Sequence, residues 1–103
     1  MPYENVITKP VYRVFSNLTQ EYRPEVALPL ALKELLRLKL NEARERQKVL
    51  EAKYGIPFDT FKTAWGADKI KDRHSYQVER DYWEWEAAVT DEAQLVEMAT
   101  QLL

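Results

Sequence analysis

Glycine and proline are confined to a few positions of this chain, and they leave two long segments free of both. All five prolines lie at or before Pro57, and the two glycines are Gly55 and Gly66. Residues 30–54 and 67–103 therefore contain neither residue type. Glycine and proline are the residues that most disfavour a helix interior. In a chain of 103 residues, two uninterrupted segments of this length predict two long helices.

The first long helix is expected over residues 24–54. Pro24 and Pro29 lie at its start, and the first turn of a helix tolerates proline because its missing N–H has no partner there. Gly55 suits the left-handed position after the last turn, and Pro57 prevents the helix from continuing.

A short helix and a second long helix are expected after this boundary. The short helix covers residues 57–65, because three aromatic residues recur at a spacing of three and four, namely Phe58, Phe61 and Trp65. The second long helix covers residues 74–103, with Ser75 or Asp72 as its N-cap. Thr90–Asp91 is also a good helix start, so this helix is either continuous or broken near residue 90.

Residues 1–23 allow two interpretations. Val11–Phe15 is β-branched and aromatic, as a short strand is, with Pro10 before it and a polar Ser16–Asn17 pair after it. A single strand is not stable alone and needs a partner strand, most simply from a second copy of the chain. The alternative is an extended arm that packs across the helices.

Each long helix carries an apolar stripe at helical spacing. On the first, the stripe consists of Leu32, Leu36, Leu40, Ala43, Gln47, Leu50 and Tyr54. On the second, it consists of Val78, Tyr82, Trp85, Val89, Val96 and Leu103. The four-three alternation from Leu36 onward is the spacing of a coiled-coil seam, so the two stripes are expected to face each other.

The margins of the two stripes have opposite charge. Residues 33–53 contain seven basic and four acidic residues, whereas residues 54–103 contain five basic and ten acidic residues. Apolar seams with oppositely charged margins favour packing against each other. We therefore interpret the basic run over residues 39–53 chiefly as the margin of a helix pair. The alternatives are a nucleic-acid surface and a surface for a protein partner.

These patterns predict a mainly α fold in a single domain, residues 1–103. We expect an antiparallel hairpin of two long helices, with a short linking helix and an N-terminal strand or extended arm. The predicted seam is formed by Leu36, Leu40, Leu50, Tyr54, Val78, Tyr82, Trp85 and Val89. The pairing is either within one chain or swapped between two chains.

Composition removes several classes of function. The chain has no cysteine and one histidine, His74, so disulfides, thiolate chemistry and multi-histidine metal sites within one chain are excluded. His74 and Ser75 are adjacent in sequence and cannot converge as a hydrolytic triad does. We expect no enzyme activity, no cofactor and no metal. No apolar run approaches a membrane span and no export signal opens the chain, so we expect a cytoplasmic protein that does not bind membranes.

The most distinctive local feature is a cluster of aromatic and acidic residues over residues 81–86. Tyr82 and Trp85 belong to the seam, whereas Trp83 points away from it, on the side of Tyr76. An exposed tryptophan usually marks a contact surface. The alternative is that the N-terminal segment or the short helix covers Trp83.

Two motifs carry a resemblance to known proteins. The sequence Tyr54-Gly55-Ile56-Pro57-Phe58-Asp59-Thr60-Phe61, followed by Glu79-Arg80-Asp81-Tyr82-Trp83-Glu84-Trp85-Glu86-Ala87, resembles small, uncharacterised helical proteins of prokaryotes. Members of that group often resemble antitoxin components of toxin–antitoxin modules. The likeness covers roughly residues 11–98; the linker here is longer and Pro24 and Pro29 depart from the pattern. The resemblance implies a non-enzymatic protein that binds a partner.

We therefore expect a module that binds another protein and occludes its surface. The most specific version of this hypothesis is an antitoxin-like protein whose partner is a basic toxin encoded nearby. The predicted contact residues are Tyr76, Asp81, Trp83, Glu84 and Asp91. Homodimerisation is expected, through a swapped hairpin or paired N-terminal strands. The alternative is a dimeric DNA-binding regulator that inserts a β-ribbon, Val11–Phe15, into a groove.

Overall fold

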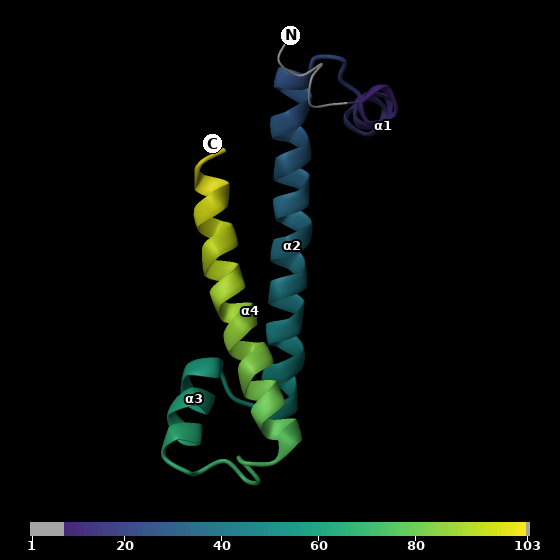
Figure 1. The fold of residues 1–103 in the computed structure, drawn as a ribbon. Coiled ribbons are helices and arrows are strands. Elements are labelled where there is room, and N and C mark those ends of the chain that lie inside the picture. Colours follow the sequence, from purple (N-terminus) through teal and green to yellow (C-terminus); the bar gives the residue numbers. More distant parts are fainter. Residues whose placement is uncertain (1–7, 103) are drawn as a thin grey trace.

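The protein consists of four helices in the computed structural model, which describes residues 8–102 (Figure 1). In chain order these are α1 (Lys9–Thr19), α2 (Pro24–Tyr54), α3 (Phe58–Gly66) and α4 (Tyr76–Thr100). The mainly α prediction is confirmed, and the part of the chain that the structure describes contains no strand.

The N-terminal prediction was wrong for residues 11–15. They lie inside helix α1, which begins with Pro10 in its first turn and ends at Gln20 in the left-handed conformation. The physical reason is spacing, because Val11, Phe15 and Leu18 recur at intervals of four and three and give a helix one apolar side. This periodicity outweighs the β-branched composition that favoured a strand. Residues 1–7 of the predicted strand or arm segment lie outside the described residues.

Helix α2 spans the residues over which the first long helix was expected. It begins at Pro24, continues through Pro29 and ends at Tyr54. Gly55 follows with φ of 73°, and its N–H donates to the carbonyl of Glu51 at 2.7 Å. The helix stops here because a left-handed residue cannot continue a right-handed helix. Glycine suits this position because a non-glycine residue would be strained in the left-handed conformation.

Helix α4 is continuous through Thr90–Asp91, so the alternative with a break near residue 90 does not hold. Its N-cap is Ser75, whose hydroxyl accepts a hydrogen bond from the N–H of Val78 at 3.3 Å. Asp72, the other N-cap candidate, lies in the connecting turn with φ of 56°. The middle of α4 gains from Ala87, Ala88 and Ala93, which are strong helix formers on both sides of residue 90.

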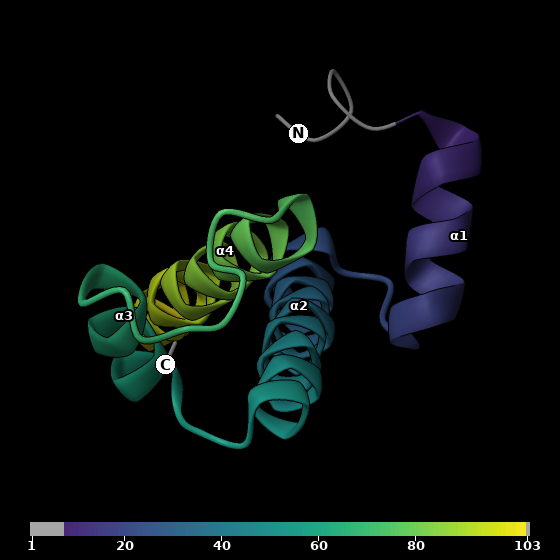
Figure 2. The same cartoon turned by 90° about the horizontal axis from the view of Figure 1, so that it is seen from below.

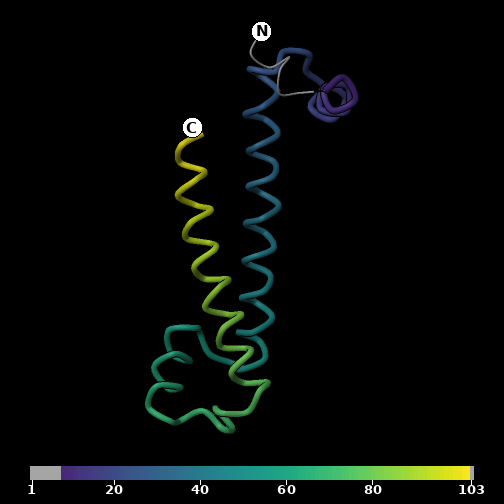
Figure 3. The backbone as a smooth tube through the Cα atoms, viewed as in Figure 1, coloured from purple at the N-terminus to yellow at the C-terminus, as the bar shows by residue number. Residues whose placement is uncertain are grey.

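The two long helices form an antiparallel hairpin within one chain (Figures 1 and 3). Helix α3 lies at the turn end of the hairpin, and α1 lies beside the start of α2, on the opposite side of the hairpin in the view of Figure 2. The molecule is elongated, with extents of 59 × 26 × 21 Å. Helix α2 has 31 residues and α4 has 25, so the start of α2 projects beyond the end of α4 (Figure 3).

The core lies at the turn end, where α3 packs against both long helices. Its buried centre consists of Leu50, Phe61 and Trp85. Phe61 and Trp85 have ring centroids 5.1 Å apart, a distance at which aromatic pairs add to the energy of burial. Partly buried residues surround this centre, namely Tyr54, Ile56, Phe58, Trp65, Ile70, Val78, Tyr82 and Val89.

The predicted seam residues therefore fall into two groups. Six of them form or border the aromatic core: Leu50, Tyr54, Val78, Tyr82, Trp85 and Val89. Leu36 and Leu40 lie further along α2 and are only half-buried. Packing is thus dense where α3 adds a third layer and thinner toward the open end of the hairpin.

Candidate functional site

The outward side of α4 carries the most exposed large aromatic residues of that helix. Tyr76 is 78% exposed and Trp83 is 65% exposed, and they lie seven residues apart on the same side. Neither α1 nor α3 covers Trp83, so the alternative of a covered tryptophan does not hold for these helices. We call this side the α4 outer face and define it by Tyr76, Arg80, Trp83, Glu84 and Asp91.

Charged side chains lie between and beside the two aromatic residues. The Nε of Arg80 donates to Oε1 of Glu84 at 2.8 Å, one helical turn along the same side. Asp91 is exposed further along the helix. The α4 outer face is therefore amphipathic, with two large rings and a mixture of charges that is mainly acidic.

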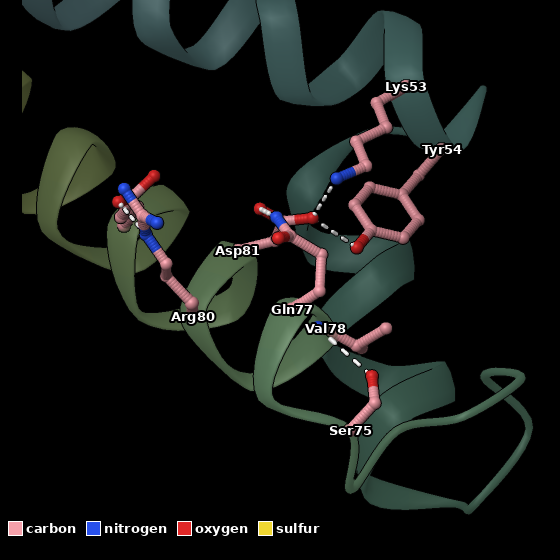
Figure 4. A network of polar contacts seen from close by, with 8 residues as sticks. Lys53, Tyr54, Ser75, Gln77, Val78, Arg80 and Asp81 are labelled. Carbon is pink, nitrogen blue, oxygen red and sulfur yellow. Dashed lines mark hydrogen bonds and ion pairs between the residues drawn. The ribbon is translucent and has the colours of Figure 1, made fainter.

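Asp81 was predicted as a contact residue, but the structure places it in the interior. It is 3% exposed and its carboxylate accepts hydrogen bonds from three side chains (Figure 4). Lys53 Nζ and Tyr54 Oη each lie 2.6 Å from Oδ2, and Gln77 Nε2 lies 3.0 Å from Oδ1. A carboxylate with this many donors has no free side for a partner. Asp81 instead joins the last turn of α2 to the second turn of α4.

The pKa values of this group follow from its surroundings. Burial raises the pKa of Asp81, but the hydrogen bonds from Lys53 and Tyr54 lower it more, so that it lies below its ordinary value of 3.8. Burial and the hydrogen bond to Asp81 both raise the pKa of the Tyr54 phenol. The cluster is therefore ionised at Asp81 and protonated at Tyr54 across the neutral pH range.

A second contact between α2 and α4 lies about three turns of α4 further along the hairpin. Arg44 Nε donates to Oε2 of Glu92 at 2.8 Å, and Gln47 Nε2 lies 3.3 Å from Oε1 of Glu92. These bonds lower the pKa of Glu92. Sequence reasoning did not single out Glu92, although its place seven residues after Trp85 puts it beside the seam.

The two helices neutralise each other only in part. Among the described residues, Lys53–Asp81 and Arg44–Glu92 are the ion pairs that join α2 to α4. Other basic residues of α2 pair along their own helix, as Arg37 does with Glu34 and Lys39 with Glu42. Glu79, Glu86 and Glu97, which are also acidic residues of α4, do not contribute to these two pairs.

A shallow groove of about 410 Å³ runs between α2 and α4 and meets the α4 outer face at Asp91. Basic and acidic side chains of α2 and the acidic Asp91 of α4 line it, and its larger apolar residues, Leu95 and Met98, come from α4. The lining residues are Lys39, Glu42, Ala43, Arg46, Asp91, Gln94, Leu95 and Met98. The outer face and this groove together offer an extended surface without an enclosed pocket, which suits a protein partner better than a small molecule.

The remaining candidates for chemistry have structural roles. The Ser75 hydroxyl caps α4, and His74 lies exposed with Nδ1 3.5 Å from Oε1 of Glu79. Within residues 8–102, no group of three or more histidine, cysteine, aspartate or glutamate side chains is placed to hold a metal ion. In the same part of the chain, none of the helices combines the length and the apolarity that crossing a membrane requires.

No protein-family model matches this chain, and no curated protein or solved structure matches it either. Of the five predicted contact residues, the structure brings Tyr76, Trp83, Glu84 and Asp91 to the exterior of α4 and places Asp81 inside.

Proposed function

We propose that the chain is a non-enzymatic protein-binding module whose contact surface is the α4 outer face. The observation that carries this proposal is the exposure of Trp83, a large apolar ring on a helix that already buries its opposite side. Aromatic residues of this kind dominate the energy of protein interfaces when a partner desolvates them. In its sharpest form the module is an antitoxin-like protein that occludes a basic toxin.

Charge supports a basic partner. Residues 54–103 contain ten acidic and five basic residues; Glu84 follows Trp83 in the sequence, and Asp91 lies about two turns further along the same side of α4. A surface with this excess of negative charge attracts a basic protein and speeds its association. The partner would cover Tyr76 and Trp83, and its basic residues would pair with Glu84 and Asp91.

Rigidity supports occlusion as the mechanism. The α4 outer face lies on a helix that Asp81 and Glu92 tie to α2 at two levels. A preorganised surface loses little conformational entropy when it binds, so more of the contact energy appears as affinity. The proposed mechanism needs no movement of the module and no chemical step.

The alternative of a β-ribbon that reads DNA is not carried forward, because residues 11–15 are helical.

We also propose that the chain is a homodimer, since one end of the single chain keeps a large apolar surface. A swapped hairpin is not needed for this, because α2 and α4 already pair within one chain.

The test is a Trp83→Ala variant. We expect native helicity and an unchanged melting temperature, because the exposed ring contributes little to the core. The dissociation constant for a partner captured from the host should rise about 30-fold or more, the usual effect of removing an interface hot spot. Calorimetry with the purified partner measures this change.

Tyr22→Ala is the matched control. Tyr22 is as exposed as Tyr76 but lies in the turn between α1 and α2, so its loss should leave the affinity unchanged. Equal weakening by both variants, or retained affinity in Trp83→Ala, would contradict the proposed surface. A large drop in melting temperature for Trp83→Ala would show that the ring is part of the core.

A further inference from the structure

Residues 26–32 form a stretch of α2 that is apolar on every side. The sequence Val-Ala-Leu-Pro-Leu-Ala-Leu contains no charged or polar side chain over almost two turns of helix. Helices that are apolar all round are normally buried, because water contacts whichever side has no neighbour. This stretch belongs to the part of α2 that projects beyond the end of α4 (Figure 1).

Helix α1 covers only one side of this stretch. Ala27 is completely buried, and it is the single fully buried residue among the described residues of this end of the molecule. Leu28, Leu30 and Leu32 remain 45%, 48% and 39% exposed and lie on other sides of the helix. A partner must therefore approach from a direction that neither α1 nor α4 occupies.

The exposed apolar surface extends onto both neighbouring segments. Further along α2, Leu35 and Leu38 are about half exposed. On α1, Val11, Val14 and Leu18 share a side with Phe15 but face solvent. We call this surface the N-terminal apolar end and define it by Val11, Val14, Leu18, Leu28, Leu30, Leu32, Leu35 and Leu38. Exposed apolar side chains gathered in this number at one end of a molecule are typical of a binding surface in a stable protein.

The molecule has enough exposed surface for a further contact. The chain has an accessible surface of 7863 Å², whereas a compact chain of 12.2 kDa has about 6,100 Å². The difference, roughly 1,800 Å², belongs to the elongated molecule as a whole, and a standard interface buries approximately 800 Å² of each partner. A dimer contact over the N-terminal apolar end would remove part of this excess.

The charge of the region allows two identical copies to meet there. Residues 24–38 contain two acidic and two basic residues, Glu25, Glu34, Lys33 and Arg37, and α1 adds Lys9 and Arg13, so the two segments together have a net charge of +2. A strongly charged surface would repel its own copy, whereas a mainly apolar surface with this small charge repels it only weakly.

We infer that the N-terminal apolar end is the interface between two copies of this chain. The contact is isologous: α1 and the first half of α2 of each copy pack against the same elements of the other, with Leu28 and Leu35 near its centre. This inference rests on the proposed homodimer and is independent of the contact through Trp83. It leaves the α4 outer face of both copies free for partners.

The first test is the mass of the full chain in solution, measured by sedimentation equilibrium over a wide range of concentration. The wild-type chain should have twice the single-chain mass of 12.2 kDa. A Leu28→Glu/Leu35→Glu double variant should have the single-chain mass at the same concentrations, with helicity retained. Val49→Glu is the matched control and should remain dimeric, because Val49 is an exposed apolar residue of the same helix outside the interface.

Each other outcome has a defined meaning. A wild-type chain that is monomeric throughout overturns both the homodimer and this interface, whether or not Trp83→Ala weakens partner binding. A folded double variant that stays dimeric overturns this interface but not the homodimer. If the double variant unfolds, the milder Leu28→Gln/Leu35→Gln pair is measured and read in the same way. A monomeric wild-type chain that binds phosphatidylcholine–phosphatidylglycerol vesicles would assign the surface to a lipid membrane instead.

A distance measurement locates the interface independently. Because the chain has no cysteine, single Lys33→Cys and Lys62→Cys variants can each carry one spin label per copy. Lys33 lies beside the proposed interface and Lys62 lies on α3 at the opposite end. Labels at position 33 should be much closer to each other than labels at position 62, and the reverse order would overturn the interface.

Discussion

At the scale of single residues, Asp81 shows how a charged side chain changes role when the chain folds. In the sequence it belongs to the aromatic and acidic cluster over residues 81–86 and is predicted to contact a partner. In the structure it is buried and receives bonds from Lys53, Tyr54 and Gln77. A buried carboxylate is tolerated only when its oxygens are satisfied in this way. The residue that looked suited to a partner therefore holds the hairpin together.

The pH dependence of stability tests this role. The folded pKa of Asp81 lies below its ordinary value of 3.8, so its contribution is fully present above about pH 4 and is lost as the pH falls through the lower, folded value. Asp81→Asn should lower the free energy of unfolding by about 1–3 kcal/mol at pH 7, and the difference from wild type should shrink toward pH 2. Urea unfolding at several pH values measures both.

Glu86→Gln is the control for this prediction. Glu86 lies exposed on the same helix, and its substitution should change stability by less than about 0.5 kcal/mol. An Asp81→Asn difference that is the same at pH 7 and at low pH would show that the carboxylate charge does not contribute. The raised pKa of Tyr54 has the opposite effect on the pH dependence of stability. Its contribution to the free energy of unfolding is fully present below the ordinary pKa of 10.0 and is lost as the pH rises above that value toward the higher, folded pKa.

At the scale of elements, the two glycines have different roles although both follow or end a helix. Gly55 has φ of 73°, a conformation that favours glycine, whereas Gly66 does not have positive φ. A Cβ added at either position would meet no other atom within 4 Å. Any difference between the two positions must therefore come from the backbone conformation and not from packing.

Alanine substitutions at the two glycines test this difference. Gly55→Ala should destabilise the protein by about 1–2 kcal/mol, the cost of the left-handed conformation for a residue with a Cβ. Gly66→Ala should be neutral or should stabilise by up to about 1 kcal/mol, because it restricts the unfolded chain. Thermal unfolding of both variants gives the comparison. Equal destabilisation at both positions would mean that α2 does not need a left-handed residue to end.

At the scale of the whole molecule, the two ends of the hairpin differ in packing. The turn end has the aromatic core of Leu50, Phe61 and Trp85, where α3 adds a third layer. The other end has, among residues 8–102, one fully buried residue, Ala27, and the exposed leucines of α2. Stability in such a molecule is not uniform, because the thinly packed end can open while the core stays closed.

Hydrogen exchange of the monomeric Leu28→Glu/Leu35→Glu variant should reveal this gradient. Amides of α1 and residues 24–34 should exchange much faster than amides of residues 44–54 and 78–92, since the latter surround the aromatic core. Wild-type protein in the dimeric state should protect residues 24–34 more strongly than the monomeric variant does. Uniform protection along α2 in the monomer would contradict the unequal packing of the two ends.

Much of the fold was accessible from the sequence because its signals are local. The absence of glycine and proline marks α2 and α4, Gly55 marks the end of α2, and the aromatic spacing over residues 58–65 marks α3. The seam residues near the turn were also identified, because helical periodicity assigns them to one side. At residues 11–15, two local signals conflicted, and the amphipathic period prevailed over β-propensity.

The sequence by itself determined which segments are helical, where α2 ends and which sides of the long helices are apolar, since these depend on backbone preference and on the 3.6-residue period. Only the tertiary structure decided that Asp81 is buried while Trp83 is exposed, although they are two residues apart. It also decided that α4 leaves the start of α2 uncovered, because this depends on how far α4 reaches along it. Burial is a property of the distances between elements, and no local pattern contains those distances.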